Sequence, residues 1–286
     1  MLHIIGYANG NGGKDTQSCM GPLVVQSHLD DKELHNVEWV ENIYARTPLT
    51  KLEALEDITD CNERLALMVS SLAKVDSKLC VLSGDHSSAM GTWSGFSKAQ
   101  NNEIGLIWID AHLDSHTPET SPSKNIHGMP LASLLGYGDP IMCNISHKGR
   151  KVNPKNLCLI GSRSYEDEEI DLLRSVGATI IHMERVQKEG FNQTFQEALS
   201  IAKNPSGYGI SIDLDAFDPL LVPGVSCQEK NGIHPDKFLK AFTTEDLKDC
   251  LGFEITEFNP YMDQNNLTLN FIDQLISAIS TWATKT

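Results

Sequence analysis

Three segments of the chain place carboxylate side chains directly after a short apolar run, and two of them also carry a histidine. In the first, Asp110, His112 and Asp114 follow the apolar run 104–109. That run is too short to cross a membrane, so we expect a strand buried on both faces, as in parallel sheets. Side chains alternate along a strand, so these three residues should point the same way at its carboxyl end. Two carboxylates and an imidazole held together are costly to bury, and a divalent metal ion between them is the simplest remedy.

The second segment, 83–87, follows the apolar run 78–82 and reads Ser-Gly-Asp-His-Ser. Its glycine allows a sharp turn, and His86 stands where the next helix should begin. A single histidine at such a place more often packs or caps a helix than binds a metal. The position of His86, just after another buried strand, makes it a candidate ligand.

The third segment begins at the end of the apolar run 208–212. Asp213 and Asp215 should share a face there, whereas Asp218 precedes Pro219 and is better explained by a turn. Taken alone, each of the three segments also fits a solvated turn at the end of a strand. Parallel strands end at one edge of a sheet, where α/β proteins bind their ligands, so the three segments together favour one shared site.

Together the segments offer four carboxylates and two imidazoles as candidate ligands: His86, Asp110, His112, Asp114, Asp213 and Asp215. One metal ion rarely takes so many anionic ligands, whereas two ions about 3.5–4 Å apart share bridging carboxylates. Oxygen-rich ligation with imidazole and no thiolate favours manganese, with iron, cobalt and zinc as alternatives. A water molecule bridging two such ions loses a proton near neutral pH, which predicts a hydroxide nucleophile.

The composition is that of an ordinary globular protein, and it narrows the class of partner. Hydrophobic residues make up 40% and charged residues 21% of the chain. The net charge of −15 and pI of about 5.0 disfavour a nucleic acid or an anionic membrane and are compatible with a cationic substrate. The seven cysteines include no C-x-x-C pair, so we expect buried free thiols. No signal peptide or long apolar stretch is visible, which predicts a cytoplasmic protein.

Short apolar runs alternate with helical patterns along the whole chain, which predicts a parallel sheet flanked by helices. We expect eight strands, near residues 2–6, 37–44, 78–83, 103–110, 156–161, 178–183, 207–215 and 250–258. Apolar residues recur at helical spacing in residues 53–75, 167–176 and 267–282. No linker interrupts the alternation, so we predict a single domain over residues 1–286. Two polar loops, 10–13 and 136–154, are interpreted either as active-site rims or as plain surface.

The motifs SGDHS, DAHLD and SIDLDAFDP, in this order and spacing, resemble those of the ureohydrolases. This superfamily of two-manganese amidino hydrolases includes arginase, agmatinase and formiminoglutamase, and the resemblance covers nearly the whole chain. Ser83 stands where the family usually has glycine. The resemblance implies a three-layer α/β/α domain with a central, mostly parallel eight-stranded sheet, and assembly as a trimer or hexamer. It also implies how the ligands divide: His86 and Asp114 on one ion, His112 and Asp215 on the other, with Asp110 and Asp213 bridging.

The resemblance singles out two further residues. Glu257 matches the carboxylate that pairs with the substrate guanidinium, and this is chemically sensible because a planar guanidinium presents paired donors to a carboxylate. Glu254 on the same strand could be confused with it. His127 matches the histidine of the family that transfers a proton, and its pKa suits protonation of a departing amine. The alternatives are an exposed glutamate and a loop histidine that caps the following helix.

The choice among ureohydrolases depends on two loops. Arginases resemble the loop 116–127 closely, and there an Asn, a Ser and an Asn bind the α-carboxylate of arginine. Ser123 and Asn125 match this pattern, whereas His116 replaces the first Asn and Lys124 replaces a frequent Gly. Glu166 falls where arginases hold the α-amino group with an Asp. Agmatine lacks the carboxylate, and formiminoglutamate would need basic contacts, for which the candidates are Lys124 and Arg163.

We therefore expect hydrolysis of L-arginine to L-ornithine and urea at a site with two Mn²⁺ ions. Hydroxide attacks the guanidinium carbon, Asp114 orients the nucleophile, and His127 supplies a proton to the departing ornithine. The alternative activities are those of a formiminoglutamase, an agmatinase or another amidinohydrolase. A metal-binding but inactive regulator is a further alternative, and it predicts the loss of a ligand, which the sequence does not show.

Overall fold

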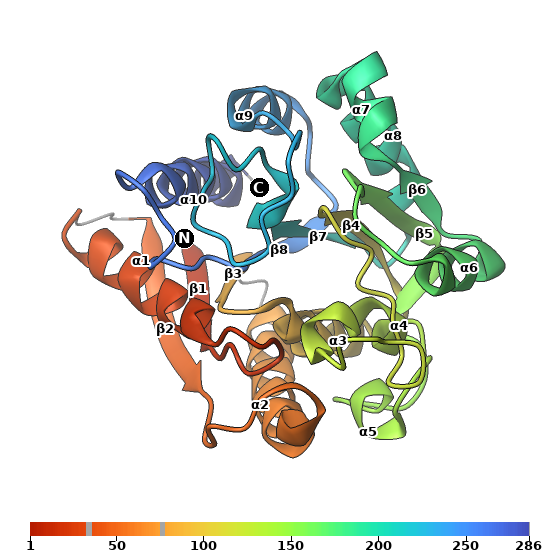
Figure 1. Cartoon of the computed structure of the whole chain (residues 1–286). Coiled ribbons are helices and arrows are strands. Elements are labelled where there is room, and N and C mark those ends of the chain that lie inside the picture. Colours follow the sequence, from red (N-terminus) through yellow and green to blue (C-terminus); the bar gives the residue numbers. More distant parts are fainter. Residues whose placement is uncertain (33–35, 75–77, 286) are drawn as a thin grey trace.

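The fold is organised around one sheet of parallel strands (Figure 1). The computed structural model describes residues 1–32, 36–74 and 78–285. Within these residues eight strands pair in the order β2-β1-β3-β8-β7-β4-β5-β6, and every pairing is parallel. The strands are β1 (Leu2–Ala8), β2 (Val37–Tyr44), β3 (Lys78–Ser83), β4 (Ile104–Ile109), β5 (Val152–Ile160), β6 (Thr179–Ile181), β7 (Tyr208–Asp213) and β8 (Cys250–Thr256). All eight predicted strands are confirmed.

Helices cover both faces of the sheet; α1 to α9 connect successive strands, and α10 follows the last strand. They are α1 (Gly21–Asp30), α2 (Leu55–Ala73), α3 (Ala89–Gln100), α4 (Pro130–Leu134), α5 (Pro140–Cys143), α6 (Asp167–Val176), α7 (Met183–Glu189), α8 (Phe191–Ala202), α9 (Pro235–Thr244) and α10 (Leu267–Lys285). The predicted helix over 53–75 corresponds to α2, and its last position, Val75, lies outside the described residues. The other two predicted helices are α6 and α10.

Two apolar cores separate the helices into layers, one on each face of the sheet. Ile107 and Ile109 of β4 point into a core shared with α1, α7, α8, α9 and α10. Leu106 and Trp108 point into the opposite core, shared with α2, α3, α4 and α6. This alternation within a strand buried on both faces confirms the predicted three-layer arrangement. None of the helices in the described residues is long and apolar enough to span a membrane.

Glycines let helices approach the central strands closely. A Cβ atom built on Gly209 of β7 would lie 1.9 Å from Cζ3 of Trp93 in α3. A Cβ atom on Gly105 of β4 would lie 1.9 Å from the carbonyl oxygen of Ala202 in α8. The strands that carry the candidate ligands are therefore held tightly between the two helical layers.

Candidate metal centre and substrate cavity

The six candidate ligands converge at the carboxyl ends of β3, β4 and β7, which lie near the middle of the sheet. His86 opens the short 3₁₀ turn before α3, and its Nδ1 atom is the centre of the first group. Nδ1 lies 3.2 Å from Asp110 Oδ2, 3.0 Å from Asp114 Oδ2 and 3.0 Å from Asp213 Oδ2. All four side chains are buried.

The second group forms around His112 and shares Asp110 with the first. His112 Nδ1 lies 3.0 Å from Asp215 Oδ2 and 3.5 Å from Asp110 Oδ1. Asp110 thus directs one carboxylate oxygen toward each histidine, as a bridging ligand would. The side chain of His112 is 28% exposed and forms the open side of the centre.

The predicted reason for this convergence is wrong, although the convergence itself is confirmed. β4 ends at Ile109 and Asp215 lies in a 3₁₀ turn, so strand alternation does not orient these side chains. Backbone turns do so instead: His112 N donates to Asp110 Oδ1 at 2.7 Å, and Asp215 N donates to Asp213 Oδ1 at 2.8 Å. An aspartate that accepts from the backbone two residues later is a common turn device.

The negative charges within the two groups favour a bound cation. Burial raises the pKa of Asp213 well above its ordinary value, and Asp215 and Asp110 add to the effect. Burial and Asp110 together raise the pKa of Asp114 to about 6. Burial alone would lower the pKa of His86, but the surrounding carboxylates raise it well above its ordinary value. The carboxylates therefore cannot all be ionised at low cost without added positive charge.

The donor atoms fit divalent ions. The buried Nδ1 atom of His86 has no hydrogen-bond partner among the described residues, and three carboxylate oxygens lie around it. Imidazole nitrogen combined with carboxylate oxygen suits manganese, iron, cobalt or zinc. No cysteine belongs to either group of ligands in the part of the chain described.

Trp108 supports the centre, and sequence reasoning assigned it only to the core. Its indole stacks on the His86 ring with centroids 4.0 Å apart, and its Nε1 donates to Asp110 Oδ2 at 2.8 Å. One side chain thereby restrains ligands from two strands. The only signal in the sequence was its place in the apolar run, two residues before Asp110.

Glu257 and His127 form an ion pair beside the centre. Glu257 Oε1 lies 3.0 Å from His127 Nδ1 and accepts a hydrogen bond of 2.9 Å from His86 N. Burial alone would lower the pKa of His127, but the Glu257 carboxylate raises it to about 9. Burial would raise the pKa of Glu257, but His127 lowers it below its ordinary value. Glu257 Oε2 makes no hydrogen bond to any other described residue.

The metal centre opens into a cavity of about 230 Å³. Ten of the predicted site residues line it, and eight of these are His112, Asp114, His116, Ser123, Asn125, His127, Glu166 and Glu257. Asp213 and Asp215 also line it. The amide oxygen of Asn125 is buried and lacks a hydrogen-bond partner among the described residues, so the cavity retains an unused polar atom.

His116 is the hub of a cluster at the far side of this cavity. Its Nε2 lies 3.0 Å from Glu166 Oε2 and 3.5 Å from Glu169 Oε2, and its Nδ1 lies 3.0 Å from Thr120 Oγ1. Glu166 and Glu169 also form the capping box that starts α6. Burial raises the pKa of Glu169 to about 8. Sequence reasoning gave no separate role to Glu169, which ends the acidic segment 166–169.

Of the two polar loops, 10–13 and 136–154, only the first lies beside the candidate site. Loop 10–13 borders the site, because Gly12 N donates to the buried carboxylate of Asp85 at 2.7 Å and Gly12 O accepts from His127 N. Asp85, which sequence reasoning also missed, therefore ties this loop to the turn that carries His86. None of the cavity-lining residues comes from loop 136–154. That loop contains α5 and the start of β5.

The two basic residues suggested for a substrate with two carboxylates do not line the cavity. Lys124 is exposed, and its Nζ donates to the carbonyl oxygen of Pro118 at 2.7 Å. The guanidinium of Arg163 donates to five backbone carbonyls, those of Gly161, Asp215, Ala216, Glu229 and Lys230. The cavity thus has no arginine or lysine in its lining.

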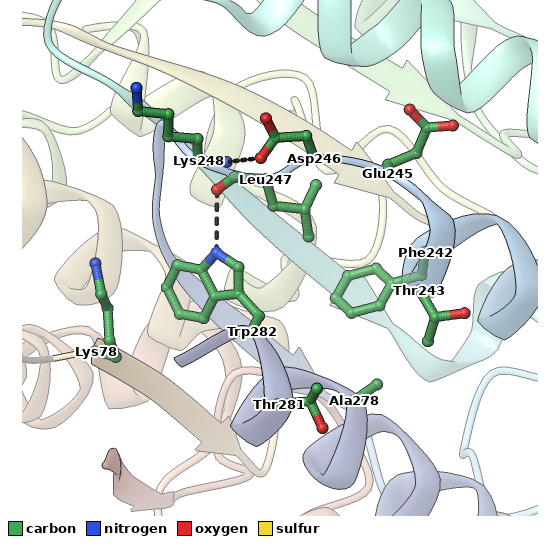
Figure 2. Close-up of a pocket in the computed structure, with 10 residues that line it drawn as sticks. All are labelled: Lys78, Phe242, Thr243, Glu245, Asp246, Leu247, Lys248, Ala278, Thr281 and Trp282. Carbon is green, nitrogen blue, oxygen red and sulfur yellow. Dashed lines mark hydrogen bonds between the residues drawn. The ribbon is translucent and has the colours of Figure 1, made fainter. Parts of the chain in front are cut away.

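A second cavity, of about 560 Å³, lies where β3 and β8 begin, at the opposite edge of the sheet (Figure 2). Trp282 Nε1 donates there to the carbonyl oxygen of Leu247 at 3.0 Å. In Figure 2 the charged ends of Lys248 and Glu245 point away from the rings of Trp282 and Phe242. None of the metal-ligand groups found in the described residues includes a residue of this cavity.

Comparison with known proteins agrees with this arrangement. A family model described as the arginase family matches residues 12–280. An arginase of Brevibacillus brevis is 36% identical over 227 residues, which cover 79% of this chain and 76% of that protein. An arginase of Staphylococcus aureus is 32% identical over 266 residues, covering 91% of this chain and 86% of that protein.

The solved structures agree as well. The crystal structure of an arginase from Bacillus subtilis superposes with a TM-score of 0.89 at 31% identity, with 98% of each chain covered. A formiminoglutamase of Trypanosoma cruzi shares the fold at 17% identity, with a TM-score of 0.79. The match of a family model to most of the chain, together with these relatives, shows that the protein belongs to the arginase family.

Proposed function

We propose that this protein hydrolyses L-arginine to L-ornithine and urea, with residues 1–286 forming one catalytic domain. The observation that carries the proposal is the position of Glu257. This carboxylate borders the same small cavity as His112, Asp114, Asp213 and Asp215, and its Oε2 atom is available to a ligand. A planar cation with paired N–H donors, such as guanidinium, matches that carboxylate.

Two divalent ions, Mn²⁺ in our proposal, would be held by the six ligands. His86 and Asp114 would bind one ion and His112 and Asp215 the other, with Asp110 and Asp213 shared. Such ions supply, when bound, the Lewis acidity that makes water reactive near neutral pH.

The residues of the chain have separate tasks in the reaction. Glu257 binds the guanidinium and holds its carbon toward the metal centre. Asp114 accepts a hydrogen bond from the attacking water and orients it. His127, whose Nδ1 faces Glu257, supplies a proton from Nε2 to the departing amine, which leaves readily only when protonated.

The amino-acid end of the substrate would reach the far side of the cavity. We propose that the Ser123 hydroxyl and the Asn125 side-chain N–H groups donate to the α-carboxylate, since both residues line the cavity. Glu166 would bind the α-ammonium group. His116 would lie beside both the α-ammonium and the α-carboxylate group of the substrate. The absence of Lys124 and Arg163 from the cavity lining argues against a substrate with two carboxylates.

Product release from Mn²⁺-loaded protein tests the proposal directly. L-arginine, agmatine and 4-guanidinobutyrate would be offered separately with urea as the readout, and formiminoglutamate with formamide as the readout. We expect turnover of arginine with little or none of the others. If the protein preferred another amidine, the proposed metal chemistry would stand, but arginine as the substrate would be rejected. Inactivity on all four despite two bound ions would favour an inactive regulator.

We also propose that the protein is a homo-oligomer, a trimer or hexamer, and works in the cytoplasm on a small cationic guanidino substrate. These proposals follow from the family relationship and the acidic composition. Light scattering coupled to size exclusion would measure the assembly. A monomeric mass at micromolar concentration would contradict it.

A further inference from the structure

A fully buried carboxylate lies behind the metal centre and belongs to none of the ligand groups. Glu254 stands on β8, and three hydroxyl groups surround it. Its Oε1 accepts hydrogen bonds from Ser88 Oγ at 2.7 Å and Thr92 Oγ1 at 2.8 Å. Its Oε2 accepts one from Ser211 Oγ at 2.8 Å.

The contact with Ser211 connects Glu254 to a metal ligand. Ser211 Oγ also lies 2.9 Å from His86 Nε2. The hydroxyl of Ser211 has one proton, and it is directed to Glu254, so the oxygen is left to accept from Nε2–H of His86. A protonated Nε2 leaves the lone pair of neutral His86 on Nδ1, the atom that three carboxylate oxygens surround.

The burial of the Glu254 carboxylate is a second reason to expect a metal ion on His86. No lysine or arginine of the described chain forms an ion pair with it, and the nearest basic atom is His86 Nε2 at 3.9 Å. A buried anion without a cation is costly, unless positive charge nearby offsets it. A metal ion on His86 would be such a charge.

We propose that Glu254, acting through Ser211, is a positioning residue that holds His86 in the tautomer and orientation needed to bind a metal ion. This inference rests on the proposed binuclear centre and adds to it a residue outside the ligand set. Histidine ligands are commonly held by a carboxylate on their second nitrogen, and removing that partner typically costs about 10–100-fold in metal affinity or activity. Here a serine hydroxyl stands between the two groups.

Metal binding to folded protein separates this role from a purely structural one. Mn²⁺ affinity would be measured by calorimetric titration of metal-free wild type, Glu254→Gln and Ser211→Ala, with circular dichroism as the check on folding. We expect each variant to lose about 10–100-fold in affinity for one of the two ions. The losses should not add in the double variant, because both substitutions break the same connection.

Ser88→Ala is the matched control. It removes a hydroxyl that contacts Glu254 but leaves Ser211 and His86 in place, so Mn²⁺ affinity should stay at the wild-type value. If Glu254→Gln fails to fold, Ser211→Ala alone decides, since it removes a single hydroxyl.

Two results would overturn the inference, and they are distinguishable. Wild type that binds two Mn²⁺ ions and hydrolyses arginine, with variants of unchanged Mn²⁺ affinity, would reject the role of Glu254 and leave the proposed function intact. Wild type that binds no Mn²⁺ would reject the proposed centre, and the inference would fail with it.

Discussion

Two residues of the candidate site have left-handed backbones, which non-glycine residues rarely adopt. Asp114 has φ of 46° and Glu257 has φ of 69°. Hydrogen bonds hold both conformations: Leu131 N donates to Asp114 O, and Glu257 N donates to Gly84 O. Such conformations cost about 1–3 kcal/mol and persist where the surroundings enforce them. The fold thus directs both carboxylates toward the cavity at the expense of local stability.

The ion pair of His127 and Glu257 predicts how stability depends on pH. His127 has its pKa raised from 6.5 to about 9, mainly by Glu257, whereas in the unfolded chain its pKa returns to the ordinary value. Below pH 6.5 His127 is protonated in both the folded and the unfolded protein, and its ion pair with Glu257 contributes fully to the free energy of unfolding. As pH rises through about 9 the folded protein also loses the proton, and the contribution disappears. A pKa change of this size corresponds to about 3 kcal/mol in the free energy of unfolding.

Urea unfolding of metal-free protein at several pH values would measure this effect. Between pH 6.5 and 9 the free energy of unfolding of wild type should fall by as much as about 3 kcal/mol more than that of Glu257→Gln. Adding His127→Asn to both proteins removes the titrating ring and should abolish the difference. Parallel pH curves for wild type and Glu257→Gln would show that the pair does not stabilise the fold.

Residue types predicted which candidate ligands converge, but not the residues that contact and restrain them. The ligands are acidic or basic side chains next to apolar runs, a contrast that is visible in a sequence. Trp108, Ser211 and Asp85 act through geometry that appears only when the strands are placed side by side. Glu254 and Glu257 are three residues apart on one segment, and only the fold shows that one faces Ser211 and the other the cavity.

At the scale of elements, Gly209 lets Trp93 of α3 pack closely on β7, the strand that ends at Asp213. In Gly209→Ala the new methyl would lie 1.9 Å from the Trp93 ring, which is fully buried and cannot turn away freely. We expect the free energy of unfolding to fall by about 1–3 kcal/mol, as for other overpacked cores. Urea denaturation at constant Mn²⁺ concentration would measure it.

A second substitution tests whether the ring is the cause. Trp93→Phe replaces the two fused rings of the indole with one smaller ring, and so removes Cζ3, the atom that the new methyl would strike. The double variant should therefore be more stable than the sum of the two single effects predicts. Additive effects would mean that Gly209 serves the strand in some other way.

The strands were predictable from sequence, but their order in the sheet was not. An apolar run such as 104–109 shows that a strand is buried on both faces, without showing which strands lie beside it. The order that places β8 between β3 and β7 brings Glu254 and Glu257 to the metal centre from the far end of the chain. Loop 136–154 was ambiguous for a similar reason. Its Lys151 is buried and donates to the carbonyl oxygens of Cys143 and Gly149, a contact that no local pattern reveals.

At the scale of the molecule, the candidate metal centre lies where the carboxyl ends of β3, β4 and β7 meet. Its ligands come from segments at residues 86, 110–114 and 213–215, and their negative charges face one another. Bound divalent ions should therefore stabilise the whole fold, because they bind the native state and not the unfolded chain. At a free ion concentration 100 times the dissociation constant the gain is about 2.7 kcal/mol.

Thermal unfolding with and without metal tests this expectation. Wild type should melt at a higher temperature in Mn²⁺ than after chelation, and the difference should grow with Mn²⁺ concentration. Asp213→Asn should lose most of this response because it removes a shared ligand. Asp218→Asn is the matched control from the same motif: its side chain accepts from Leu220 N in a turn, which asparagine can also do, so the response should persist. Coincident melting curves for wild type with and without Mn²⁺ would mean that the carboxylates tolerate one another unaided, and the metal centre would lose its physical basis.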